Sequence, residues 1–182
     1  FHDQAAYDAA LARGDSLLYE FYEMGVPDSE KDVAYGTSIT YPGKIGDEYY
    51  MTKGHFHTII DTAEVYYCLR GQGYMMMETP EGETEWREFL PGKAVYVPGR
   101  WAHRSINVHP TEPLVTFFAF PGNAGHDYGT IERQGLQVRR IAPGRNEFGA
   151  MGDHHHHLER RSPSDHRAQQ FQRSRIGPVR VL

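Results

Sequence analysis

The chain has 182 residues, with 19 Lys and Arg against 24 Asp and Glu and a formal net charge of -5 at pH 7, which is about the size of one domain. Hydrophobic residues make up 39% and aromatic residues 13%, and there are 19 Gly and 11 Pro. This composition excludes wholesale disorder and favours a turn-rich β protein over a helical bundle. Residues 1–142 carry 12 Lys and Arg against 20 Asp and Glu, which disfavours nucleic acid as a partner.

No stretch approaches the ~20 consecutive apolar residues of a membrane span, and no charged-then-apolar leader opens the chain. We therefore expect a cytoplasmic protein with no membrane partner. Cys68, the single cysteine, cannot form an internal disulfide and lies in an apolar run. It is expected to be a buried structural thiol.

The chain order predicts a short helix followed by a β domain. Residues 3–13 are Ala-rich and end at Gly14, so they are expected to form a helix in an N-terminal arm over 1–16. Runs rich in Tyr, Val, Ile, Phe and Thr then alternate with Gly and Pro turns. They predict strands over 17–24, 34–41, 48–52, 63–70, 73–79, 94–97, 103–108 and 114–120, with 81–85 as a solvated turn. Short strands at this spacing indicate a sandwich or barrel over 17–142.

Beyond residue 143 the apolar runs stop, so 143–182 is expected to be a tail, flexible or partly derived from the expression vector. Four consecutive histidines, 154–157, lie in it. Consecutive residues of an extended chain point to opposite sides and preform no metal cage, so we assign this tract no site.

The residues with the strongest chemical signal are His55, His57, Glu64 and His103. In a strand, residues two apart share a face, so His55 and His57 can both point inward. Glu64 lies in an apolar strand pattern, where a carboxylate is costly unless it is paired or binds a metal. Three imidazoles and a carboxylate suit Fe(II), Mn, Co, Ni or Zn and leave positions open for substrate. A His-x-His pair alone is also common on sheet surfaces, so it is weak evidence without the other two residues.

The second half of the pattern is Gly92, Pro98, His103 and Asn107. With it, the sequence resembles the cupin superfamily, whose two motifs bring three His and one Glu together inside a small barrel. The resemblance implies an all-β fold, a single double-stranded β-helix (jelly-roll) with a short N-terminal helix. Two departures are Arg100, which stands where the second motif has Gly, and the gap from His57 to Glu64, which is longer than most cupins have.

Longer segments resemble one branch, the cupin-type glucose-6-phosphate isomerases. They are YPGKIGDEYYMTKGHFH over 41–57, AEVYYCLRGQGYMMMETPEG over 63–82, PGKAVYVPGRWAHRSIN over 91–107 and AGHDYGTI over 124–131. The resemblance implies one divalent metal, usually iron, held by His55, His57, Glu64 and His103. It also implies a homodimer and a sugar-phosphate substrate.

The same resemblance implies roles around the metal. Substrate and phosphate contacts fall on Tyr19, Ser38, Thr52, the backbone of Gly54 and Tyr128, and His126 and Tyr66 fall beside the reacting end of the sugar. Ser38 replaces an expected Thr and keeps its hydroxyl, whereas Phe120 replaces an expected Tyr and cannot donate a hydrogen bond. Taken alone, each Tyr is as well explained by barrel packing, and Met75, Met76 and Met77 by core filling. Lys44 or Lys53 could add positive charge at a phosphate.

The implied reaction interconverts glucose 6-phosphate and fructose 6-phosphate, a step of glycolysis and gluconeogenesis. It needs either proton transfer through a cis-enediol, with Glu64 or His126 as the base, or a metal-assisted hydride shift. The use of mannose 6-phosphate is open. Other functions open to this ligand set are an Fe(II)-dependent dioxygenase and a cupin that binds sugar phosphate without turnover.

Overall fold

The structure, a computed structural model, describes residues 1, 3–14, 17–136 and 179–180. It is built mainly of antiparallel strands, with two helices in the described part of the chain, α1 (Gln4–Arg13) and α2 (Tyr128–Gln134). The strands are β1 (Leu17–Met24), β2 (Val33–Thr40), β3 (Lys44–Ile45), β4 (Glu48–Tyr49), β5 (Glu64–Arg70), β6 (Gly73–Glu78), β7 (Thr84–Phe89), β8 (Ala94–Val97), β9 (Ala102–Asn107), β10 (Leu114–Pro121) and β11 (Val179–Arg180). No described helix has both the length and the apolar character needed to cross a membrane.

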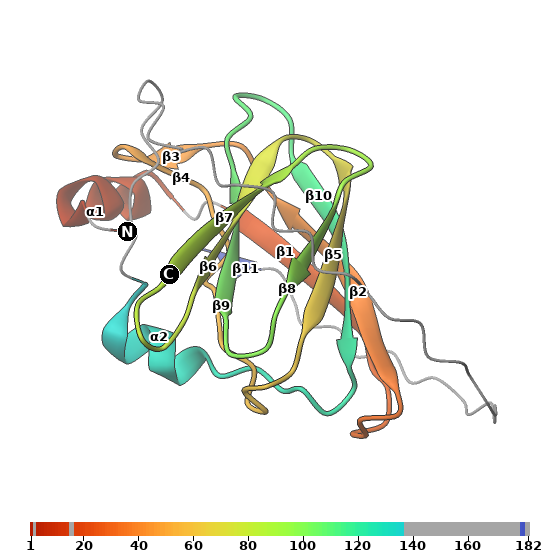
Figure 1. Ribbon diagram of the computed structural model, residues 1–182. Helices are drawn as coiled ribbons and strands as arrows, with labels where there is room; N and C mark the ends of the chain where they lie inside the picture. Colours follow the sequence, from red (N-terminus) through yellow and green to blue (C-terminus); the bar gives the residue numbers. More distant parts are fainter. Residues whose placement is uncertain (2, 15–16, 137–178, 181–182) are drawn as a thin grey trace.

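Two sheets face each other and form a barrel (Figure 1). The larger sheet has the order β11-β1-β2-β10-β5-β8 and the smaller has the order β7-β6-β9. β5 and β10 pair across 44 or more intervening residues, so the sheets are made by long-range crossovers rather than by successive hairpins alone. This arrangement is the expected all-β cupin barrel.

Side chains alternate across the larger sheet as the period of two requires. In β5 the burial pattern places Glu64, Tyr66 and Cys68 inside and Val65 and Tyr67 outside. The inner faces of both sheets meet in a core that includes Met75, Met77, Phe89, Leu114 and Phe118 with the inner residues of β5 and β8. Apolar side chains make up most of this core, and Glu64 at the start of β5 belongs to the polar site described below.

Helix α1 begins and ends with recognisable caps. The Asp3 side chain accepts a hydrogen bond from the Ala6 backbone N–H at 2.8 Å, and Gly14 ends the helix with a positive φ of 123°. Such caps satisfy backbone groups that the helix leaves unpaired. The helix packs beside β3 with Ala10, Leu18, Tyr19 and Ile45 in a separate small core.

Most predicted strands are confirmed to within one or two residues, and Cys68, Met75, Met76 and Met77 are all buried in the core as expected. The prediction for 48–52 was too long, because regular pairing ends at Tyr49 and only Met51 forms a further bridge. The prediction of a turn over 81–85 was wrong in its second half, where Thr84 and Glu85 begin β7. β3, β7, β11 and α2 were not predicted.

The described residues cover the N-terminal helix and most of the predicted 17–142 domain. Within the predicted tail, only Val179 and Arg180 are described, and they pair with Tyr19 and Leu17 at the outer edge of β1. The boundary at residue 142 and the tract His154–His157 lie outside the described residues.

Candidate metal centre and active site

Three histidines and one glutamate converge inside the barrel from three places in the sequence. Glu64 begins β5, His103 lies in β9, and His55 pairs with His103 through an isolated antiparallel bridge. His57 follows two residues later on the same extended segment. One ligand atom from each of these four residues lies within 4.8 Å of those of the others, and all four residues are buried. The predicted metal ligands are therefore brought together.

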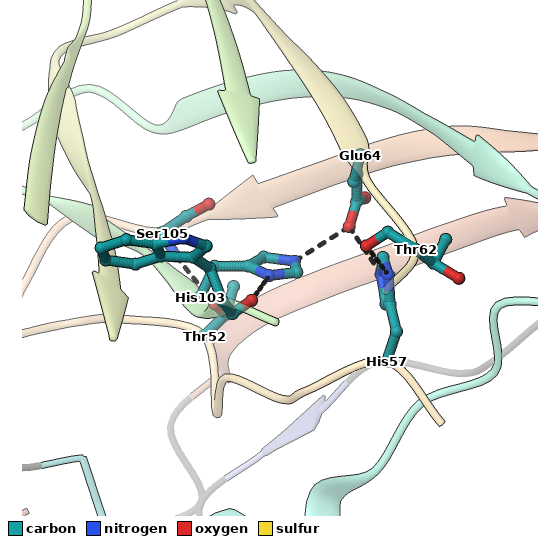
Figure 2. A network of polar contacts seen from close by, with 7 residues as sticks. Thr52, His57, Thr62, Glu64, His103 and Ser105 are labelled. Carbon is teal, nitrogen blue, oxygen red and sulfur yellow. Dashed lines mark hydrogen bonds and ion pairs between the residues drawn. The ribbon is translucent and has the colours of Figure 1, made fainter. Parts of the chain in front are cut away.

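Glu64 is the centre of this group (Figure 2). Its Oε2 lies 3.1 Å from Nε2 of His57 and 2.9 Å from Nε2 of His103. Burial alone would raise the pKa of Glu64, but attraction and hydrogen bonding from His103 and His57 outweigh it and lower the pKa to about 2. The carboxylate is therefore ionised at neutral pH.

The second nitrogens of two histidines are held by backbone carbonyls. Nδ1 of His57 lies 3.1 Å from the Thr62 carbonyl oxygen, and Nδ1 of His103 lies 3.2 Å from that of Trp101. An N–H on Nδ1 bonded in this way leaves the Nε2 lone pair directed at the centre, as in metal-ligating histidines. Nε2 of His55 is buried and has no hydrogen-bond partner. Burial, followed by the charges of His103, His126 and His57, holds the pKa of His55 well below its usual value, so its imidazole is neutral.

This donor set fits a divalent cation. A bound ion would be coordinated by the buried carboxylate and the three imidazoles, including the unpartnered Nε2 of His55. Without an ion, that buried polar atom stays unpaired. His55, His57, Glu64 and His103 could therefore hold one metal, as the motif predicted.

A pocket opens beside the candidate metal ligands His55 and His103. It encloses about 490 Å³ of empty space, which includes the open solvent at its mouth. All five residues predicted to contact the sugar phosphate line it, together with residues that sequence reasoning did not assign. The lining is Tyr19, Phe21, Ser38, Thr52, Lys53, Gly54, His55, Tyr66, His103, Ser105 and Tyr128.

Two of the unassigned lining residues had a usable signal. Ser105 lies two residues after His103 in β9 and so shares its face, and Phe21 lies two residues after Tyr19 in β1. The Thr52 hydroxyl accepts a hydrogen bond from the Ser105 N–H at 3.0 Å, which ties the glycine-containing segment to β9. Ser38 has a buried hydroxyl with no partner, so it is available to a ligand.

The tyrosines of the pocket stay protonated at neutral pH. Burial is the main cause of a raised pKa in Tyr19, Tyr66 and Tyr128, and it raises that of Tyr128 to about 12. Neutral phenols donate hydrogen bonds, and such donors suit an anionic ligand better than phenolates would.

His126 and Tyr66, predicted to lie beside the reacting end of the sugar, both contact rings of the candidate metal ligands, but only Tyr66 lines the pocket. The His126 ring lies 4.4 Å from the His55 ring and is stacked on Tyr128 at 5.8 Å between centroids. Its Nε2 is buried without a partner. Burial lowers the pKa of His126 to about 4, with smaller effects of Glu64, which raises it, and of His57 and His103, which lower it.

Phe120 packs against His57 and His126, with ring centroids 5.6 Å and 5.3 Å away, and does not line the pocket. The hydroxyl of the Tyr expected at this position would therefore lie beside the metal ligands and not in the pocket. Of the candidate cations, Lys53 lines the pocket, lies 5.5 Å from the Tyr128 ring centroid and pairs with Glu132, whereas Lys44 lies over Tyr49.

A comparison with protein families decides the relationship. The model of the family described as "Glucose-6-phosphate isomerase (GPI)" matches residues 1–157. The chain belongs to the glucose-6-phosphate isomerase family. The cupin-type branch of this family is the one that the sequence resembles, and the match extends beyond the segments on which that resemblance was based.

Curated members of the glucose-6-phosphate isomerase family match over most of their length. The chain is 46% identical to "Glucose-6-phosphate isomerase" of Thermococcus litoralis over 136 residues, which are 75% of this chain and 71% of that protein. It is 44% identical to the protein of the same name from Pyrococcus furiosus, with the same coverage. It is 42% identical to "Putative glucose-6-phosphate isomerase 2" of Rhizobium meliloti, over 74% of this chain and 68% of that protein.

Solved structures give the same fold for this family member. An oxalate oxidase in complex with glycolate superposes with a TM-score of 0.51 at 14% identity, covering 63% of this chain and 56% of the oxidase. A second oxalate oxidase structure gives a TM-score of 0.52 at 14% identity, covering 68% and 61%. These likenesses establish the cupin barrel alone.

Proposed function

We propose that this chain is a metal-dependent glucose-6-phosphate isomerase that interconverts glucose 6-phosphate and fructose 6-phosphate. The observation that carries the proposal is that two kinds of residue line the same pocket. Two of the candidate metal ligands, His55 and His103, line it, and so do the hydroxyl-bearing residues Tyr19, Ser38, Thr52 and Tyr128. A sugar phosphate has both an end that needs an electrophile and an end that needs many hydrogen-bond donors.

The cofactor in this proposal is one divalent ion, Fe(II) in the first place, with Mn, Ni, Co or Zn as substitutes. When bound, the ion supplies an electrophile for the two sugar oxygens that exchange a proton during isomerisation. His55, His57, Glu64 and His103 would hold it. Fixing these ligands is the task of β5, β9 and the bridge between His55 and His103.

Hydroxyl donors bind the phosphate in this proposal. Tyr19, Ser38, Thr52, Tyr128 and the backbone N–H of Gly54 are uncharged donors. Lys53 adds positive charge at the pocket wall, where its ammonium is half-exposed and paired with Glu132. Because exposed ion pairs contribute only about 0–1 kcal/mol, a phosphate dianion can compete with Glu132 for Lys53.

His126 is the less engaged of the two candidate bases, although neither His126 nor Glu64 lines the pocket. Its Nε2 is buried and unpartnered, and its lowered pKa keeps it neutral at pH 7, so it can accept a proton. Oε2 of Glu64 already lies close to His57 and His103. We therefore propose that His126 accepts the carbon-bound proton and that Glu64 orients the ligand histidines. Tyr66 lies beside them and can donate a hydrogen bond from its hydroxyl.

A hydride shift is the alternative route, and it predicts no exchange with solvent. Turnover of fructose 6-phosphate in deuterated water distinguishes the two. Deuterium bound to carbon 2 of the glucose 6-phosphate product supports proton transfer to a base, whereas full retention of the substrate hydrogen together with undiminished turnover in His126→Gln contradicts the role of His126.

An oxygen-dependent reaction is the alternative function for the same ligand set. The hydroxyl-lined pocket argues against it, because an apolar substrate would leave these donors unpaired. The test is a coupled assay of fructose 6-phosphate isomerisation with metal-loaded protein under anaerobic conditions. Undiminished turnover without oxygen supports the isomerase. Absence of turnover with every divalent metal, in protein that binds the metal, contradicts it.

The family resemblance also underlies two further proposals, a homodimer and a cytoplasmic location. The dimer has some support in the outer face of the larger sheet, where Tyr67, Leu69, Tyr96 and Phe117 are exposed. Sedimentation equilibrium measures the oligomeric state directly.

A further inference from the structure

Glu23 is a carboxylate that the reaction described above does not use. It lies in β1, two residues after Phe21 and four after Tyr19, both of which line the pocket. Because side chains alternate along a strand, Glu23 shares their inward face. Its cross-strand partner is Gly36, and the same row of the sheet continues through Phe118 to Tyr66, another pocket residue.

Oε2 of Glu23 is buried and has no hydrogen-bond partner. The neighbours on this face offer none: Gly36 has no side chain, and the rings of Phe21 and Phe118 stack at 4.6 Å with an interplanar angle of 6°. A Cβ at Gly36 would lie 2.6 Å from the Phe118 ring, so that ring fills the space over the glycine. A buried carboxylate oxygen without a partner lowers the stability of the fold. A hydrogen bond from a bound ligand would explain why the chain keeps one here.

The electrostatic neighbours of Glu23 belong to the active site. Burial is the first cause of its raised pKa, and the negative charge of Glu64 is the second. Burial likewise dominates the raised pKa values of Tyr66 and Tyr128, and the charge of Glu23 adds to both. The charge of Glu23 therefore acts on Tyr66 and Tyr128, which both line the pocket.

We infer that Glu23 is a specificity-determining residue whose free carboxylate oxygen accepts a hydrogen bond from a hydroxyl group of the bound sugar. This inference rests on the proposed function for the class of ligand, a phosphorylated polyhydroxy chain. In the proposed function the phenols, the hydroxyls and Lys53 of the pocket bind the phosphate, which leaves the sugar hydroxyls to other groups. A sugar hydroxyl needs an acceptor, and Glu23, although it is not itself a lining residue, follows the lining residues Tyr19 and Phe21 on the inward face of β1.

The test compares two ligands that cannot react, glucitol 6-phosphate and inorganic phosphate, by calorimetric titration of the metal-loaded protein. The variants are Glu23→Gln and, as a matched control, Glu20→Gln. Glu20 lies on the same strand with the opposite facing and accepts a hydrogen bond from the Tyr41 hydroxyl at 3.2 Å. We expect Glu23→Gln to weaken glucitol 6-phosphate binding about tenfold or more, since a charge-assisted hydrogen bond is lost, and to leave phosphate binding within about twofold. Glu20→Gln should leave both affinities unchanged.

Thermal unfolding of the ligand-free variants separates binding from structure. Removal of an unpartnered buried charge should raise the melting temperature of Glu23→Gln, whereas removal of a structural hydrogen bond should lower it. Glucitol 6-phosphate affinity within twofold of wild type would overturn the inference. So would equal weakening of both ligands with a lower melting temperature, or wild-type protein that binds glucitol 6-phosphate no better than phosphate. If only glucitol 6-phosphate binding is weakened and the wild-type protein shows no isomerase turnover, Glu23 still binds the polyol. In that case the proposed function is refuted instead.

Discussion

Arg100 adopts a backbone conformation that normally belongs to glycine. Its φ is 72°, and it is the one described residue other than glycine with a positive φ. The cupin resemblance placed a glycine at this position, and the structure explains why one is suited to it. The left-handed region costs a residue with a Cβ roughly 1–2 kcal/mol. The Arg100 side chain forms an exposed ion pair with Glu81 at 2.7 Å, which compensates little.

Arg100→Gly should therefore raise the free energy of unfolding by about 1 kcal/mol, measured by urea unfolding at pH 7. Arg100→Ala is the matched control, since it also removes the ion pair but keeps the Cβ. It should give no gain. A loss of stability in Arg100→Gly greater than in Arg100→Ala would contradict the assignment of strain to this residue.

His126 should make the metal-free protein less stable in mild acid. Its folded pKa is about 4 and its unfolded value is about 6.5, so between these values the unfolded chain binds a proton that the folded chain does not. Stability is therefore complete above about pH 6.5 and is lost as the pH falls toward 4. Urea unfolding of chelated protein at several pH values should give a shallower slope over this window for His126→Gln than for wild type. An unchanged slope would contradict the buried, neutral state of His126.

At the scale of elements, patterns of side chains predicted the strands that make regular ladders. Runs such as 64–70 and 114–121 alternate apolar and polar residues or are rich in aromatic and β-branched ones, so their strand character is local. β7 has the sequence TEWREF, whose charges suggest solvent and whose strand character comes from pairing with β6. β3 has two residues, too few for a periodic signal.

Helix α2 was missed because its signal is short. The Asp127 side chain caps it by accepting from the Thr130 N–H at 3.1 Å, but the helix has only 7 residues and a glycine near its start.

The sequence predicted which residues bind the metal but not how the fold brings them together. His55 and His57 lie outside any named strand, and the bridge to His103 that positions them joins segments 48 positions apart.

Tyr128 opens α2, and its hydroxyl is expected to bind the phosphate. Tyr128→Phe should weaken inorganic phosphate binding and raise the Michaelis constant for fructose 6-phosphate, at a cost of about 1–3 kcal/mol. The control is Tyr96→Phe, because Tyr96 is 61% exposed on the outer face of β8. Wild-type phosphate affinity in Tyr128→Phe would show that Tyr128 is only a packed aromatic residue.

At the scale of the whole molecule, the described barrel contains every residue assigned to the site, so we expect the 143–182 segment not to be needed for chemistry. Its removal should leave isomerase activity within about twofold. Because β11 pairs with the edge of β1 beside Tyr19, the truncated protein should be tested for folding by thermal unfolding as well. Loss of activity in a truncated protein that stays folded would place part of the site in this segment.

The central claim is that a metal held by His55, His57, Glu64 and His103 is needed for isomerisation. The most direct measurement is turnover of fructose 6-phosphate by chelator-stripped protein that is resupplied with each divalent metal in turn, for wild type, His57→Ala and His109→Ala. The account predicts that stripping abolishes turnover and that one equivalent of metal restores it in wild type and in His109→Ala. His57→Ala should need at least ~10-fold more metal, since losing a ligand should weaken binding at least as much as losing an outer-shell partner. Full turnover in stripped wild type, or recovery of His57→Ala at the same metal concentration as wild type, would contradict it.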